Sequence, residues 1–322
     1  MCSNNNKIEV IQIGQKEFEI YHYTSVSSLK SIIKDKALRF TEGRFLNDKN
    51  EFNCLKDVIN VLKDDEDYDI RLFAEQYAYI AEEKYDGTGI VLVPIDGAFS
   101  FSKYQLYVFS ASLNPDSLPL WNYYSKEGRS WGYNIKINID QILKIFSNFK
   151  KNSLIVYHGK VMYDMNEKIE FVKDRIREIT KSFEVERQKI ILKYKNDENT
   201  MLIELDVLVQ EKESKIIELF ELCRLVFKEK YFKHEEEYRI VLSVTNYYPS
   251  QLLKREYTEK NGLVRPHFDL LLNDLLFIDE IKISPLIDFN LAKESLQMYI
   301  NTYCSEEDKS KNITKSLINI RF

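Results

Sequence analysis

The sequence is short of the residues that build phosphate loops, disulfide frameworks and structural metal sites. It has nine glycines and six prolines, and neither GxGxxG nor GxxxxGK[ST] occurs, so the common Gly-rich nucleotide-binding loops are excluded. The four cysteines include no CxxC pair, which argues against zinc ribbons and disulfides and favours reduced thiols inside a cell. Only four histidines occur, without an HxxxH spacing, so we expect no metal site.

Long apolar runs and a strong charge of one sign are also lacking. No run approaches the roughly 18 apolar residues of a membrane span, and the N-terminus lacks a basic region followed by an apolar stretch. We therefore expect a cytoplasmic protein without a membrane partner. The net charge of −5 in 322 residues means that any basic binding surface must be local. Aromatic residues are plentiful, with 21 Tyr and 19 Phe, which favours aromatic-lined cores or clefts.

Hydrophobic periodicity predicts strands and helices along the whole chain. Segments rich in β-branched and aromatic residues are typical of strands, and they cover residues 7–13, 17–23, 37–41, 105–112, 132–138, 153–161, 238–244 and 276–284. Helical spacing covers residues 25–34, 47–62, 70–84, 140–149 and 289–300. Strands before and after a helical block indicate an α+β fold, with a mostly antiparallel central sheet and flanking helices.

A long helical hairpin is expected in the middle of this fold. Apolar residues hold a heptad-like spacing between residues 169 and 190, and a more apolar second helix follows over residues 202–230. We expect residues 1–163 and 231–322 to form two parts of one α+β domain, with residues 164–230 as an inserted hairpin. The two helices can pack on each other, which we favour, or support a homodimer.

His22 is the first candidate for chemistry, because it ends a predicted strand and is followed by the hydroxyl-bearing Tyr23 and Thr24. An imidazole beside hydroxyl groups can hydrogen-bond a ribose or a phosphate. The alternative is a structural histidine whose ring is satisfied by neighbouring backbone.

The second candidate is the run of three glutamates from Glu235 to Glu237, closely followed by Arg239. On an extended segment alternate side chains share a face, so Glu235 and Glu237 would point the same way. Two converging carboxylates can shift each other's pKa, or one can accept a hydroxyl hydrogen bond while the other orients a nucleophile. A solvated acidic patch with Arg239 as its ion-pair partner is the alternative.

The third candidate is aromatic. Trp121 and Tyr124 are three residues apart and would share one face of a helix. They can stack on a planar ring or fill the core.

In order and spacing, eight short segments resemble the bacterial domain-of-unknown-function family 2971. The resemblance spans about residues 19 to 300 and rests on residues 21–24, 38–40, 47–51, 109–110, 120–124, 132–135, 235–239 and 279–285. The family's layout is in turn similar to the ADP-ribosyltransferase superfamily, in which three separate segments gather around NAD. The implied activity is that of an NAD-dependent ADP-ribosyltransferase or an NAD glycohydrolase, in a toxin or a defence effector, with a protein or nucleic-acid acceptor.

This resemblance also implies roles for individual residues. His22 would hold ribose hydroxyls, Tyr124 would flank the nicotinamide, and Glu237 would be the late catalytic acid. Glu235 would position the acceptor, as in the arginine-modifying branch of the superfamily. The remaining implied contacts are Ser110 or Ser112 as a brace for the glutamate, Trp121 as an aromatic wall, and Arg44 or Arg39 against the pyrophosphate.

Cleavage of the nicotinamide–ribose bond places positive charge on the anomeric carbon, which a nearby carboxylate stabilises. NAD is then a substrate, and the reaction needs no metal. Two other functions stay open from the sequence. One is a non-catalytic module that binds a nucleotide or a nucleic acid and docks a protein through the hairpin. The other is a nuclease-type hydrolase that holds Mg²⁺ with Asp48, Glu51 and Glu237.

Overall fold

The computed structural model describes residues 9–13, 17, 19–46, 53–82, 93–95, 98–100, 104–124, 131–146, 154–245, 253–260, 262–272, 274–306 and 311–319. The chain divides into two compact units. Unit 1 comprises residues 1–46, 105–161 and 231–322, and unit 2 comprises residues 47–104 and 162–230. The sequence did not indicate that residues 47–104 group with the long helices, and the predicted division into an interrupted domain and an insertion stays a prediction.

A central sheet with flanking helices forms unit 1, as expected. Its eleven strands are β1 (Glu9–Ile13), β2 (Glu19–Thr24), β3 (Ala37–Glu42), β6 (Tyr104–Ser112), β7 (Tyr133–Asn138), β8 (Leu154–Lys160), β9 (Glu237–Thr245), β10 (Leu253–Lys260), β11 (Leu263–Leu271), β12 (Ile278–Ile283) and β13 (Asn312–Lys315). The sheet is mixed, because β1 pairs with β8 and β12 with β13 in parallel. Pairs such as β2–β7 and β8–β9 run antiparallel.

Strand β6 is the point where this sheet branches. The main path runs β1-β8-β9-β6-β2-β7-β12-β13, and a branch of β3, β11 and β10 also joins β6. Thr41 of β3 pairs with Val108 in the middle of β6, whereas Tyr21 of β2 pairs with Ser112 at its end. The residues of β6 between Val108 and Ser112 lie between the two branches, and we call this place the β6 fork.

The hydrophobic core of unit 1 covers one face of the sheet. It joins the strands to α1 (Val26–Asp35), α5 (Ile139–Phe146) and α8 (Phe289–Tyr303). Alternate residues such as Ile20, Phe109 and Tyr238 point into this core. The intervening residues face the other side, where Tyr23 packs with α4 (Leu118–Tyr124).

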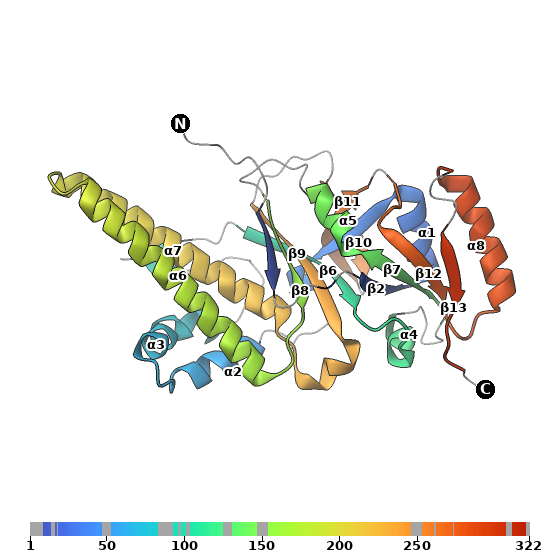
Figure 1. The fold of residues 1–322 in the computed structure, drawn as a ribbon, viewed down its shortest axis with the longest axis horizontal. Helices are drawn as coiled ribbons and strands as arrows, with labels where there is room; N and C mark the ends of the chain where they lie inside the picture. Colours follow the sequence, from blue (N-terminus) through green and yellow to red (C-terminus); the bar gives the residue numbers. More distant parts are fainter. Residues whose placement is uncertain are drawn as a thin grey trace. The chain divides into compact units, whose positions relative to one another are not determined.

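Unit 2 is built around the two long helices expected from the heptad-like pattern. Helices α6 (Met165–Lys193) and α7 (Glu198–Val226) lie side by side as a hairpin (Figure 1). Asp164 caps α6, since its carboxylate accepts the N–H groups of Asn166 and Glu167. The unit also contains α2 (Asn53–Leu62), α3 (Tyr68–Glu82) and the small β4 (Val93–Ile95) and β5 (Ala98–Ser100) sheet. None of the helices in the described part of the chain is long and apolar enough to cross a membrane.

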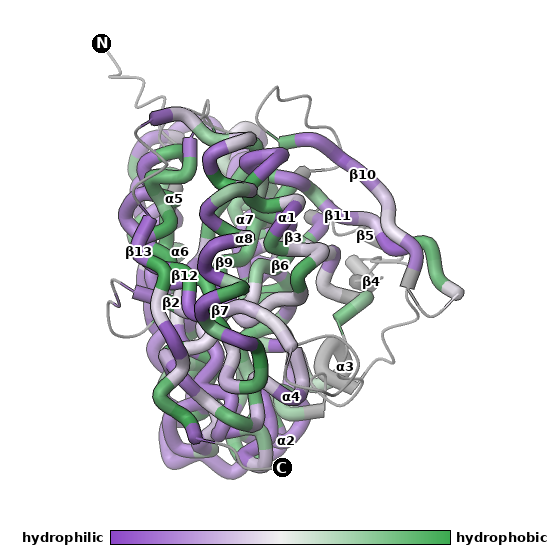
Figure 2. The backbone as a smooth tube through the Cα atoms, turned by 90° about the vertical axis from the view of Figure 1, so that its right-hand side faces the viewer, coloured by the Kyte–Doolittle hydropathy of each residue, from purple (hydrophilic) through white to green (hydrophobic). Residues whose placement is uncertain are grey.

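Two short helical turns complete the structure, η1 (Gly43–Phe45) and η2 (Lys230–Glu235). The β10–β11 hairpin was not predicted from the sequence. Its strand β10 is hydrophilic along most of its length (Figure 2), so it lacks the apolar alternation on which strand prediction relies.

Candidate functional site

His22, the first candidate, lies on β2 and contacts strand β6 at the β6 fork. Nδ1 of His22 lies 3.0 Å from the carbonyl oxygen of Ser110, and because a carbonyl only accepts, Nδ1 carries the proton. The ring also packs on Phe109, with centroids 4.8 Å apart. Burial lowers the pKa of His22, and the hydrogen bond to Ser110 raises it in part. No hydrogen bond to Nε2 is found within the described part of the chain, so in the neutral ring this nitrogen can accept a proton from a ligand.

The late glutamate segment joins the same strand two residues further on. The Ser112 hydroxyl donates to the backbone carbonyl of Glu235 at 2.6 Å. The Leu113 N–H donates to the carbonyl of Glu236 at 2.7 Å. The amide of Asn114 donates to the Glu236 carboxylate at 3.0 Å. Ser112, one of the two serines expected to brace Glu237, thus contacts the backbone of Glu235, and a brace for Glu237 stays a prediction.

The expectation that Glu235 and Glu237 point the same way assumed an extended segment. Instead Glu235 ends the helical turn η2, and Glu236 adopts a left-handed conformation with φ 44°. Strand alternation begins only at Glu237. The pairing of the two carboxylates does not follow from the observed backbone, because a helical turn followed by a left-handed residue breaks the two-residue period.

Glu237 is held in a buried ion pair. Its two carboxylate oxygens accept from Nε and Nη2 of Arg239 at 2.8 and 2.9 Å, and the residues are 7% and 2% exposed. Since Tyr238 points into the core, Glu237 lies on the opposite face of the sheet. His22 lies on the core side, with Phe109 and Ile20. The sheet thus separates the two residues that the resemblance places around one ligand.

The aromatic candidates divide between core and surface. Trp121 is fully buried, and Tyr23 packs edge-on against it with centroids 4.8 Å apart. Tyr124 ends α4 and is 42% exposed. Core packing therefore accounts for Trp121, whereas Tyr124 and its neighbour Tyr123 are exposed. Tyr123 lies 6.0 Å from the ring of His234 on η2.

Several other candidates can be placed only in part. Thr24 is buried at the end of β2. The backbone of Arg44 lies in η1, but its side chain lies outside what the structure describes, as do Asn47, Asp48 and Glu51. Arg39 pairs with Asp269 at 3.0 Å, so its charge is compensated. Among the described residues no group of three His, Cys, Asp or Glu is arranged to hold a metal ion.

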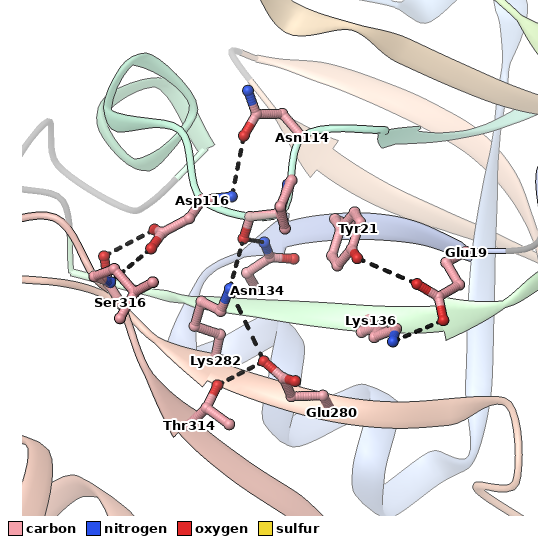
Figure 3. Close-up of polar contacts among 12 residues, drawn as sticks. Glu19, Tyr21, Asn114, Asp116, Asn134, Lys136, Glu280, Lys282, Thr314 and Ser316 are labelled. Atoms are coloured by element: carbon pink, nitrogen blue, oxygen red, sulfur yellow. Dashed lines mark hydrogen bonds and ion pairs between the residues drawn. The ribbon is translucent and has the colours of Figure 1, made fainter.

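The loop from Asn114 to Ser117 belongs to the site, although sequence reasoning missed it. The Tyr23 hydroxyl donates to the Asn114 carbonyl and accepts from the Ser117 N–H. The Pro115 carbonyl accepts from Asn134 and Lys282 (Figure 3). An Asn-Pro-Asp run is a recognisable turn signal, but nothing in the sequence says which strands will hold it.

Comparison with known proteins gives one match. A family model described as a protein of unknown function, DUF2971, matches residues 120–240. The match supports the resemblance to this family, and it does not extend to the ADP-ribosyltransferase superfamily. The matched residues include Trp121, Glu235 and Glu237. They begin after His22 and strand β6, so neither of these is matched. No curated protein matches the chain, and no solved structure matches it.

Proposed function

We propose that this protein cleaves the nicotinamide–ribose bond of NAD at the β6 fork, as an ADP-ribosyltransferase or an NAD glycohydrolase. One observation carries the proposal. Strand β6 holds the His22 ring at the Ser110 carbonyl and the Glu235 turn at the Ser112 hydroxyl. These anchor points are two residues apart, about 7 Å along a strand. The two groups start from opposite faces of the sheet, because Ser112 alternates with Phe109 and Ala111 of the core. The ligand in this proposal therefore spans the fork between β2 and β3 to reach both the imidazole and the carboxylate-bearing turn.

In this proposal His22 acts as a neutral hydrogen-bond acceptor. Its lowered pKa keeps the ring unprotonated near pH 7, and Nδ1 is committed to Ser110. Nε2 then accepts a hydrogen bond from a ribose hydroxyl. The tautomer is fixed by the backbone, so the ribose contact needs no rearrangement of the ring.

We assign the late carboxylate to Glu235 in preference to Glu237. Both oxygens of Glu237 are engaged by Arg239, which neutralises the charge that an oxocarbenium-like transition state requires. Glu235 ends η2, and its backbone carbonyl accepts from the Ser112 hydroxyl at the fork. Glu237 and Arg239 then support the start of β9.

Tyr124 and Tyr123 supply exposed rings at the end of α4 that can flank the nicotinamide or the acceptor. The acceptor is a protein or a nucleic acid if the protein is a transferase, and it is water if the protein is a glycohydrolase. Action as a toxin or a defence effector is part of the same proposal.

The test is to incubate the purified protein with NAD, with and without cell lysate, and to follow nicotinamide release. We expect release by the wild type, its loss in Glu235→Gln without a lower melting temperature, and ADP-ribose on macromolecules if transfer occurs. Glu294→Gln is the matched control, since Glu294 is an exposed glutamate on α8. Absence of release under both conditions contradicts the proposal, and thermal stabilisation by NAD without turnover would instead favour a binding module.

A further inference from the structure

Asp116 gathers hydrogen bonds from two distant parts of unit 1. Its Oδ1 accepts from Nε1 of Trp121 and from the hydroxyl of Ser316, both at 2.8 Å. Its Oδ2 accepts from the N–H of Leu317 at 2.7 Å. One carboxylate therefore joins α4 to the segment that follows β13, as Figure 3 shows for Ser316.

The same residue continues toward the candidate site. The Asp116 N–H donates to Oδ1 of Asn114 at 3.1 Å, and Nδ2 of Asn114 donates to the Glu236 carboxylate at 3.0 Å. The Asn114 N–H donates to the Ser112 hydroxyl at 3.0 Å, and that hydroxyl donates to the carbonyl of Glu235. Hydrogen bonds thus run without a gap from Ser316 to Glu235.

The far end of this path needs external support. Glu236 has φ 44°, a conformation that residues other than glycine keep only where their surroundings hold it. The Asn114 side chain and the Leu113 N–H are two of the groups that hold it. The loop is in turn fixed over β7 and β12, where Asn134 and Lys282 donate to the Pro115 carbonyl (Figure 3).

We propose that Asp116 and Ser316 are positioning residues, and that the segment after β13 orients the Glu235–Glu236 turn for catalysis through Asp116. This inference rests on the proposed function, because it treats Glu235 as the group to be oriented. A small displacement of a catalytic carboxylate lowers turnover more than it lowers substrate affinity.

The experiment compares Ser316→Ala, Ser316→Thr and Asp116→Asn with Thr314→Val. Thr314 controls for the neighbouring contacts, because its hydroxyl donates to Glu280 and not to Asp116, and among the described residues Glu280 reaches the loop only through its 3.9 Å ion pair with Lys282. For Ser316→Ala and Asp116→Asn we expect kcat for nicotinamide release to fall on the order of tenfold with an unchanged KM for NAD. Ser316→Thr keeps the hydroxyl and should restore kcat, and Thr314→Val should match the wild type.

Hydrogen exchange of the Leu113 and Glu236 amides gives a readout independent of activity. We expect faster exchange at both amides in Ser316→Ala and Asp116→Asn, with wild-type exchange in Thr314→Val. Unchanged kcat and exchange in both variants would overturn the proposal, as would an equal loss in Thr314→Val. If the wild type releases no nicotinamide, the proposed function fails, and exchange alone then decides whether Ser316 and Asp116 order the turn.

Discussion

At the scale of single residues, His22 makes the stability of the fold depend on pH. Burial holds the pKa of His22 below its ordinary value of 6.5, so between these two values the unfolded chain binds more protons than the folded one. The free energy of unfolding should therefore fall as the pH drops through 6.5 toward the folded-state pKa. Urea denaturation at pH 7.5 and 5.5 should show a smaller pH effect for His22→Gln than for the wild type.

The ion pair of Glu237 and Arg239 should be one of the most sensitive sites in unit 1. Removing one partner leaves the other charge buried, so we expect Glu237→Leu to lower the free energy of unfolding by roughly 3–5 kcal/mol. The double variant Glu237→Leu with Arg239→Met should recover most of that loss, because no charge then stays buried. Urea denaturation of the three proteins checks this, and a double variant no better than the single one would contradict the ion-pair argument.

Sequence reasoning found the residue types of the candidate site more readily than their orientation. The resemblance implied that Ser110 or Ser112 braces Glu237, whereas the Ser112 hydroxyl donates to the Glu235 carbonyl. Sequence reasoning could not anticipate the left-handed Glu236, because a non-glycine residue in that conformation depends on contacts with a loop 120 residues away. The distribution of His22 and Glu237 over two faces depends likewise on strand pairing.

At the scale of elements, the local hydrophobic pattern predicted which segments form strands, but the pairing between strands decided where each strand lies in the sheet. The predicted strand over residues 105–112 and the observed β6 (Tyr104–Ser112) differ by one residue. That β6 contacts both β2 and β3 is a property of three separate segments, so it is absent from any local period. The fork, and with it the candidate site, could not be derived from the sequence alone.

Gly159 marks a place where one element leaves no room for a side chain. A Cβ on Gly159 would lie 2.6 Å from the Cβ of Ile13 and closer still to its carbonyl oxygen, so Gly159→Ala must displace the paired strand β1. We expect a loss of about 1–3 kcal/mol and faster hydrogen exchange along β1. Gly262→Ala is the control. Its φ of 75° strains an alanine locally, but nothing lies within 4 Å of the new Cβ, so the amides of β1 should exchange as slowly as in the wild type.

At the scale of the whole molecule, the oligomeric state depends on whether the apolar residues of the α6–α7 hairpin pack within one chain or against a second copy. Lys212 of α7 lies over the Phe183 ring of α6, 4.8 Å from its centroid, so the heptad-like stripe of α6 is used within the chain. Val185 and Leu192 are exposed. Each lies two residues after a member of the stripe, Phe183 or Ile190. Residues two apart on a helix differ by roughly 200° around its axis, so Val185 and Leu192 lie on the side of α6 opposite the stripe.

These exposed positions bear on whether a second copy binds. Leu202, Ile203, Val207 and Val209 of α7 are also exposed. They form two pairs, Leu202 with Val209 and Ile203 with Val207, which lie roughly 130° apart around the helix and do not form one continuous seam. We therefore expect a monomer, with a mass of 38.3 kDa in sedimentation equilibrium that does not change with concentration. A mass that rises toward twice this value would instead support a homodimer through the hairpin, and Leu192→Glu would then have to return it to the monomer.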